Sequence, residues 1–122
     1  MIYPIETEDL WQQALLSGTY IPASYENDGF IHCTALERIT DVANRHFQGS
    51  HDLLLLCISQ KLLEAEMLWE LSDDGLHYPH IYGPLNTSAV SAAVPFPCNG
   101  DGTFGLPANM PEDRDGLPAA DE

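Results

Sequence analysis

An unbroken run of six apolar residues, Leu53–Ile58, constrains the fold of this chain more than any other feature. The run lies between polar turn segments, and no polar residue interrupts it. Such a pattern is typical of a β-strand that is buried on both faces. The run is far too short to cross a membrane, which takes roughly 20 apolar residues. The chain has 122 residues, the size of one domain, so we expect this strand to lie in a single core.

Two main helices are predicted in the N-terminal half. The first runs from a cap at Thr7 to a stop at Gly18, with two acidic residues in its first turn, where the helix dipole favours carboxylates. The second follows Thr34, which together with Glu37 matches the capping-box pattern. Between the two helices, residues 19–29 are rich in turn formers and predict a loop.

Short strands surround these helices and continue after them. The predicted strands cover residues 1–5, 30–33, 53–58, 67–71, 80–82 and 89–96. This order indicates an α+β fold with an antiparallel or mixed sheet. We expect one domain over residues 1–107 and an acidic, disordered tail over residues 108–122, because glycine, proline and acidic residues dominate the tail without periodicity.

The charge balance excludes two classes of partner. The chain carries 19 acidic residues against 4 basic ones, a formal net charge of −15. Nucleic-acid binding depends on many contacts between Lys or Arg side chains and phosphates. Anionic membrane surfaces repel an acidic protein for the same reason. We therefore expect neither nucleic acid nor membrane as a main partner.

The spacing of cysteine and histidine argues against crosslinks and metal. The three cysteines form no Cys-x-x-Cys pair, and their odd number argues against a disulfide framework. The first residues lack the basic start and apolar run of a signal peptide, so we expect a cytoplasmic protein. A zinc site needs three or four converging ligands. Only His77 and His80 lie close together in the sequence, and we expect no metal site.

His32 is the sharpest candidate for a functional residue. It ends a predicted strand directly before the predicted helix start, where free backbone N–H groups and the helix dipole favour an anion. The alternative is a buried histidine bonded to a backbone carbonyl. The neighbouring Thr34 is explained by its capping role alone.

A second candidate segment covers residues 77–85, where two prolines and a glycine surround two histidines and two tyrosines. Such a rigid aromatic segment suits a ligand-lining strand. Strand alternation places His80 and Tyr82 on one face, towards a pocket or solvent. The alternative is a stiff hairpin with exposed rings.

Two charged residues have both a functional and a structural interpretation. Glu70 lies among apolar neighbours, where partial burial raises a carboxyl pKa; the alternative is a solvated hairpin residue. Arg45 shares a helix face with Arg38 and Asp41, which is most often a surface ion-pair ladder of small energetic value.

Together these motifs resemble domain of unknown function family 952 over about residues 1–107. The resemblance is carried by Tyr3, Trp11, Gly18, Tyr20 and residues 28–34, 53–58, 68–70, 79–85 and 101–107. That family has a fold similar to the ADP-ribosyltransferase fold, which includes tRNA 2′-phosphotransferases and rifampicin ADP-ribosyltransferases. The residue pattern from His32 to the Leu53–Ile58 strand resembles the corresponding segment of the phosphotransferases.

The resemblance implies chemistry on NAD, as a substrate and not as a bound cofactor. The glycosidic bond to nicotinamide breaks through an oxocarbenium-like transition state. In this reading His32 and Thr34 bind the ribose, and Tyr20 or Tyr82 stacks on the nicotinamide ring. The remaining roles fall to three further residues. Glu70 or His80 orients the acceptor or the ribose, and Arg45 lies near an arginine of the phosphotransferase helix.

Three functions therefore remain open on the sequence. The first is an NAD-consuming enzyme, and the second is a non-catalytic module that binds a small ligand with the same fold. Pro4-Ile5-Glu6, which stands where many transferases of this fold carry His-Gly-Thr or His-Gly-Ser, favours the second. The paired His32 and His80 motifs favour the first, so the sequence does not decide between the two. The third is a domain that binds a partner through its acidic surface. The sequence does not specify an oligomeric state, a substrate or an acceptor.

Overall fold

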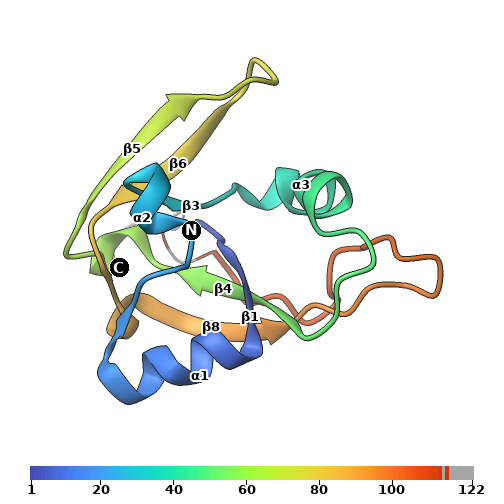
Figure 1. The fold of residues 1–122 in the computed structure, drawn as a ribbon, viewed down its shortest axis with the longest axis horizontal. Helices are drawn as coiled ribbons and strands as arrows, with labels where there is room; N and C mark the ends of the chain where they lie inside the picture. Colours follow the sequence, from blue (N-terminus) through green and yellow to red (C-terminus); the bar gives the residue numbers. More distant parts are fainter. Residues whose placement is uncertain (114, 116–122) are drawn as a thin grey trace.

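The structure, a computed structural model, describes residues 1–113 and 115. Strands and helices alternate in the first half of the described chain, and strands dominate the second half (Figure 1). All strand pairs recorded in this part of the chain are antiparallel. The predicted α+β class is confirmed, but the strands form three small sheets, not one.

The first sheet is built around the apolar run. Strand β4 (Leu53–Ile58) lies between β1 (Ile5–Thr7) and β8 (Val90–Pro95). All six side chains of β4 are buried. Successive side chains of a strand point to opposite faces, and those of β4 divide between two core clusters. The prediction of a strand buried on both faces is confirmed.

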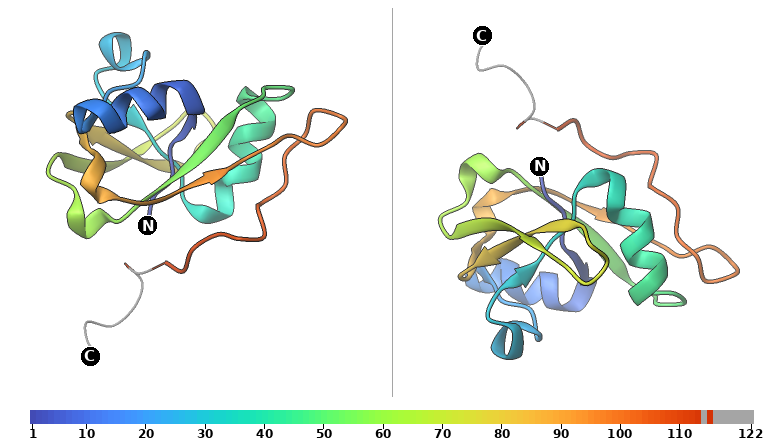
Figure 2. Two further views of the ribbon diagram at one scale, coloured as in Figure 1. Left: turned by 90° about the horizontal axis from the view of Figure 1, so that it is seen from below. Right: turned by 90° about the horizontal axis from the view of Figure 1, so that it is seen from above.

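Each face of this sheet is covered by one helix. Helix α1 (Glu8–Ser17) contributes Trp11 and Ala14 to the cluster around Leu56. Helix α3 (Ile39–His46) contributes its own buried residues to the other cluster, which surrounds Leu55. Figures 1 and 2 show the two helices on either side of β4 and β8.

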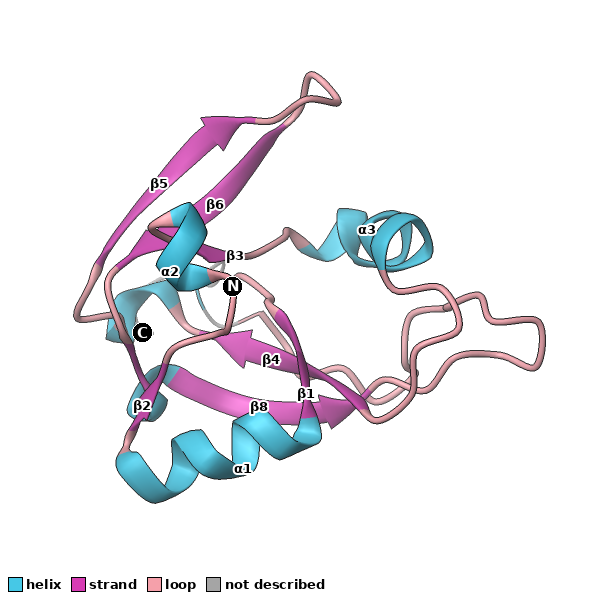
Figure 3. Ribbon diagram, in the orientation of Figure 1, coloured by secondary structure: helices cyan, strands magenta, loops and turns pink. Residues whose placement is uncertain are grey.

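A second sheet stands beside the first and carries the candidate residues. Its strand order is β3 (Ile31–His32), β6 (His77–Tyr82), β5 (Glu66–Leu71). Strands β5 and β6 extend together as a long hairpin (Figure 3). The remaining pair joins β2 (Thr19–Tyr20) to β7 (Leu85–Asn86).

Helix α1 has the ends that the sequence predicts. The Thr7 hydroxyl accepts a hydrogen bond from the backbone N–H of Leu10 at 3.4 Å. Gly18 has φ 84° and ψ 0°, and its N–H donates to the Ala14 carbonyl. This left-handed conformation favours glycine, which has no Cβ to clash.

The predicted start of the second helix at Thr34 is wrong. A 3₁₀ turn over Leu36–Arg38 comes first, and α3 begins only at Ile39. Thr34 remains extended because its backbone pairs with Tyr3, with N–H to carbonyl distances of 2.9 and 3.0 Å. Its hydroxyl donates to the Ala35 carbonyl and caps no helix. The anion site expected at a capped helix start therefore lacks its helix.

Local structure differs from the prediction in two other places. The predicted loop over residues 19–29 contains β2 and the one-turn helix α2 (Tyr25–Asp28), which is too short to show periodicity. Strand β6 begins before the predicted residue 80 and includes Pro79. The Pro79 carbonyl accepts from Cys33 N–H at 3.1 Å, so this proline still joins the sheet.

The predicted tail lies partly outside the described residues. Within them, Asp113 accepts a hydrogen bond from the Met1 ammonium group at 2.8 Å. Asp115 accepts from the Gln60 N–H at 2.7 Å and from the Ser59 hydroxyl at 2.8 Å. These two residues therefore contact the domain. In the described part of the chain, no helix is both long and apolar enough to pass through a bilayer.

Candidate functional site

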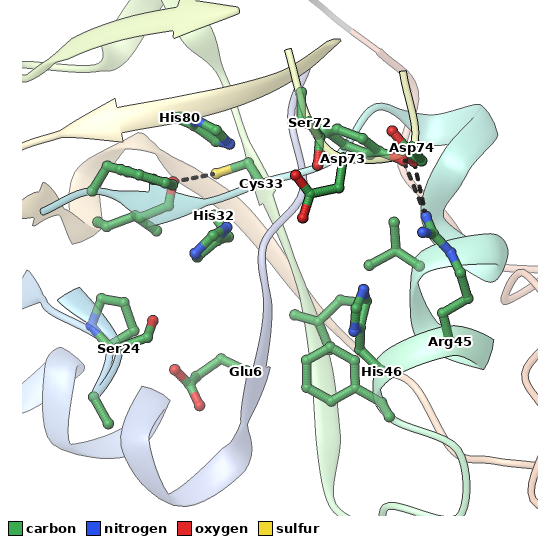
Figure 4. A pocket seen from close by; sticks show the side chains of 18 of the residues that line it. Glu6, Ser24, His32, Cys33, Arg45, His46, Ser72, Asp73, Asp74 and His80 are labelled. Atoms are coloured by element: carbon green, nitrogen blue, oxygen red, sulfur yellow. Dashed lines mark hydrogen bonds and ion pairs between the residues drawn. The ribbon is translucent and has the colours of Figure 1, made fainter. Parts of the chain in front are cut away.

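A cavity of about 660 Å³ lies between the second sheet, α3 and the end of β1. Its walls also include the loop over residues 22–24 and the turn of the β5–β6 hairpin. Figure 4 shows side chains from these separate elements around one space. Volumes of about 300–1,000 Å³ are ordinary for small-molecule sites.

Two histidines from distant parts of the chain meet in this cavity. His32 on β3 stands directly opposite His80 on β6 in the antiparallel register. Their ring centroids lie 5.5 Å apart with an interplanar angle of 74°. Both residues line the cavity.

A carboxylate is hydrogen-bonded to His80, and a phenol is hydrogen-bonded to that carboxylate. Nδ1 of His80 lies 2.8 Å from Oε1 of Glu70, which also accepts a hydrogen bond from the Tyr82 hydroxyl. The bond from Tyr82, followed by that from His80, lowers the pKa of Glu70. The expected rise of this pKa through burial is therefore wrong. Neither Glu70 nor Tyr82 lines the cavity.

His32 is more open to solvent than His80. Its side chain is 57% exposed, and Nε2 lies 2.8 Å from Oδ2 of Asp28 at the end of α2. The alternative of a buried histidine bonded to a backbone carbonyl is therefore wrong.

Phe30 completes an aromatic wall. Its ring stacks on His80 with centroids 4.0 Å apart and an interplanar angle of 21°. The same ring lies 4.6 Å from the His32 ring. Sequence reasoning did not select Phe30, although strand alternation places it on the same face as His32.

The end of the cavity beside β1 holds a buried acidic residue, Glu6. Its Oε1 accepts a hydrogen bond from the Tyr20 hydroxyl, and its Oε2 accepts from the Thr7 N–H at 2.7 Å. Burial and, next, the Glu6 charge raise the pKa of Tyr20, which keeps this phenol protonated as a donor. Sequence reasoning missed the role of Glu6, because an acidic residue at the end of a short strand gives no signal of burial.

A group of three side chains ties α3 to the hairpin turn, and we call it the Arg45–Asp74–Tyr78 clasp. Arg45 donates to Oδ2 of Asp74 at 3.1 Å and to the Tyr78 hydroxyl at 3.2 Å. Tyr78 in turn donates to Asp74 at 2.5 Å. The predicted surface pair of Arg45 with Asp41 is also present, at 3.6 Å.

Comparison with known proteins identifies the family. The family model described as "Protein of unknown function (DUF952)" matches residues 5–93. The chain belongs to the DUF952 family. An X-ray structure of protein CC0527 from Caulobacter crescentus has a TM-score of 0.79 and 33% identity, covering 86% of this chain and 93% of that chain. The solution NMR structure of CC0527 has a TM-score of 0.75 and 33% identity, covering 84% and 90%. No curated protein matches the chain.

The structure of this DUF952 protein separates the seven candidate residues into three groups. The residues that line the cavity are His32, His80, Tyr20 and Arg45. Glu70 and Tyr82 stand behind His80, and Thr34 is buried in its pairing with Tyr3. Tyr20 is 2% exposed and packs edge-on against Trp11, so its ring offers no open face for stacking.

Two further chemistries have no support in the DUF952 structure. Cys33 lines the cavity, but burial raises the pKa of its thiol well above the usual range, which keeps it protonated and a poor nucleophile. Within residues 1–113 and 115, no group of three or more His, Cys, Asp or Glu side chains is placed to hold a metal ion.

Proposed function

We propose that the cavity of this DUF952 protein binds NAD or a related nucleotide, with His32 and His80 in contact with it. The observation that carries the proposal is the cross-strand pairing of two imidazoles at one cavity of about 660 Å³. One nitrogen of each ring is bonded to a carboxylate, and in a neutral imidazole the other nitrogen is then an acceptor, which suits the donating hydroxyls of a ribose. The resemblance of the chain to the ADP-ribosyltransferase fold supports a nicotinamide nucleotide as the ligand.

The reaction implied by that resemblance is ADP-ribosyl transfer or hydrolysis of NAD. The bond between ribose C1′ and the nicotinamide nitrogen breaks, and its electron pair leaves with the nicotinamide. Water or an acceptor hydroxyl then adds to C1′ and loses a proton, which Nε2 of His80 accepts. Carboxylates in the cavity lining favour the positive charge that develops on the ribose.

A second candidate is a non-catalytic module that binds the same ligand. The position of Glu70 favours it, because this carboxylate lies outside the cavity lining and its Oε1 is already bonded to His80 and Tyr82. Many transferases of this fold carry a histidine motif on the first strand, and this chain has Pro4-Ile5-Glu6 there. The difference also favours binding without turnover.

Calorimetric titration of NAD into the wild type and three variants tests the proposal. We expect binding by the wild type and affinity at least about tenfold weaker in H32A and H80A, because each loses a contact to the ligand. H77A is the matched control, since His77 lies on the same strand β6 but outside the cavity lining.

Chromatography of the same samples separates the two candidates. Nicotinamide released with time supports the enzyme, whereas bound but intact NAD supports the module. The proposal is wrong if NAD, ADP-ribose and nicotinamide all fail to bind the folded wild type.

A further inference from the structure

The end of the cavity beside β1 contains a buried carboxylate that has no cationic partner in the described part of the chain. Glu6 is 9% exposed and lines the cavity on the same side as His32 and Ser24 (Figure 4). Its recorded partners are all neutral: the Tyr20 hydroxyl, the Thr7 N–H group and the Thr7 hydroxyl, which donates to Oε2 at 3.3 Å. No Lys, Arg or His side chain of the described residues forms an ion pair with it. A buried carboxylate is strongly stabilised by a positive charge placed beside it.

The cavity lining as a whole is also negatively charged. Among the described residues, its lining contains the carboxylates of Glu6, Asp73 and Asp74 but only one guanidinium, that of Arg45. Arg45 is already paired with Asp74 at 3.1 Å and lies 3.6 Å from Asp41. With neutral imidazoles, the cavity therefore favours a positive group of a ligand over a negative one.

Aromatic rings line the same cavity. The Phe30 and His80 rings are stacked 4.0 Å apart, and His32 stands beside them. The His80 side chain is only 10% exposed, and its Nδ1 is bonded to Glu70. Among the described residues, its Nε2 has no protein partner and remains an acceptor for a ligand. Aromatic faces attract cations, and the attraction strengthens when water is excluded.

We infer that this cavity binds a flat, positively charged heteroaromatic ring, with Glu6 as its counter-ion and the rings of Phe30 and His80 as its aromatic contacts. The inference deepens the proposed function and rests on the use of this cavity as a ligand site. In NAD, the pyridinium ring of nicotinamide has this chemistry. Glu6 then selects between ligands by the charge of the ring.

Three rings of nearly equal shape test the role of charge. We would titrate the 1-methylnicotinamide cation, neutral nicotinamide and the nicotinate anion into the ¹⁵N-labelled protein and obtain dissociation constants from backbone shifts. We expect wild-type protein to bind the cation at least about tenfold more tightly than the anion. In E6Q, which retains an acceptor for Tyr20, this preference falls to about twofold or less. E8Q is the control, because Glu8 is exposed on α1 and outside the cavity, and the preference persists.

The Y20F variant separates the effect of the Glu6 charge on the ligand from the effect of its hydrogen bond with Tyr20. It removes a partner of Glu6 and leaves the carboxylate, so we expect the preference for the cation to persist while E6Q loses it. Equal binding of cation and anion by the wild type, or a preference that survives in E6Q, overturns the inference.

If NAD still binds in either case, the proposed function stands without the inference. Conversely, a Glu6-dependent preference for the cation without NAD binding supports the inference and rejects NAD as the ligand. If neither NAD nor any of the three rings binds, both are overturned.

Discussion

His32 and His80 each have one ring nitrogen held by a carboxylate, and this fixes what the other nitrogen offers. The Glu70 carboxylate can only accept, so in a neutral His80 ring the proton lies on Nδ1 and Nε2 is an acceptor. By the same argument, Asp28 places the proton of neutral His32 on Nε2. In the proposed function, Glu70 is therefore a positioning residue that orients His80 towards the ligand.

Removal of the Glu70 carboxylate tests this role. We expect E70A to bind NAD about fivefold more weakly, because His80 loses the hydrogen bond that orients it. E70Q retains an acceptor for Nδ1 and restores most of the affinity. E66A, an exposed change at the start of the same strand, leaves affinity unchanged. Calorimetry measures the NAD affinity of each variant. Wild-type affinity in folded E70A would show that Glu70 has no positioning role.

At the scale of single residues, the sequence singles out the two histidines of the cavity but not Glu6 and Phe30, which line the same cavity. His32 and His80 are candidates on the sequence alone because each lies in a short strand bounded by turn residues. Glu6 and Phe30 gave no comparable signal, because their importance comes from residues that are distant in the chain. The Glu6 carboxylate is buried only where β1 passes Tyr20, and Phe30 stacks on His80 only after β3 pairs with β6.

At the scale of elements, the structure confirms some predictions that rest on local pattern and contradicts one. Strand β4 followed from its unbroken apolar run, and α1 from Thr7 and Gly18 at its ends. The capping role of Thr34 failed because this residue pairs with Tyr3. A local motif cannot reveal that a residue distant in the chain will pair with the same backbone.

The connection between β6 and β7 depends on a glycine at position 83. Gly83 has φ 152°, and a Cβ added there would lie 3.0 Å from the Cβ of Ala65. We expect G83A to lower the free energy of unfolding by about 1–3 kcal/mol, because both the backbone and the contact are strained. G100A is the control, since a Cβ there meets nothing within 4 Å. Urea denaturation of both variants provides the measurement, and equal stability of G83A and the wild type would contradict the expectation.

The Arg45–Asp74–Tyr78 clasp makes stability depend on pH. The hydrogen bond from Tyr78, followed by that from the Leu76 N–H, lowers the pKa of Asp74 from its usual value of 3.8. In the acid range the unfolded chain therefore binds more protons than the native protein at this site. The stabilisation by Asp74 is complete above pH 3.8 and is lost as the pH falls through the lower native pKa.

Urea denaturation between pH 6 and pH 2.5 tests the clasp. We expect D74N to be less stable than the wild type at pH 6 and to lose stability less steeply as the pH falls. D73N removes the adjacent carboxylate, which accepts no recorded hydrogen bond in the described part of the chain, and retains the wild-type slope. Parallel pH profiles for D74N and the wild type would show that the clasp does not contribute to the pH dependence of stability.

At the scale of the whole molecule, a net charge of −15 opposes compactness. Like charges repel one another over about 10 Å at 0.1 M salt and over longer distances at lower ionic strength. We therefore expect the Tm at pH 7 to rise by several degrees between 10 mM and 500 mM NaCl. KCl at the same ionic strength serves as the control for ion identity. A Tm that is constant or falls with added salt would contradict this view.

The position of the cavity could not be predicted from the sequence. The element order gave the α+β class, but not the division of the strands into separate sheets. The cavity exists because the β5–β6 hairpin extends beyond β4 and its turn meets α3 through the clasp. That arrangement depends on long-range packing, whereas the sequence patterns report only local structure and burial.

An NMR titration that observes the imidazole nitrogens while NAD is added shows whether both histidines contact the nucleotide. We expect the signals of His32 and His80 to shift together and to saturate at one NAD concentration. Signals of His51 and His77, which lie outside the cavity lining, remain in place. Unchanged His32 and His80 signals, or shifts confined to the other histidines, would contradict the account.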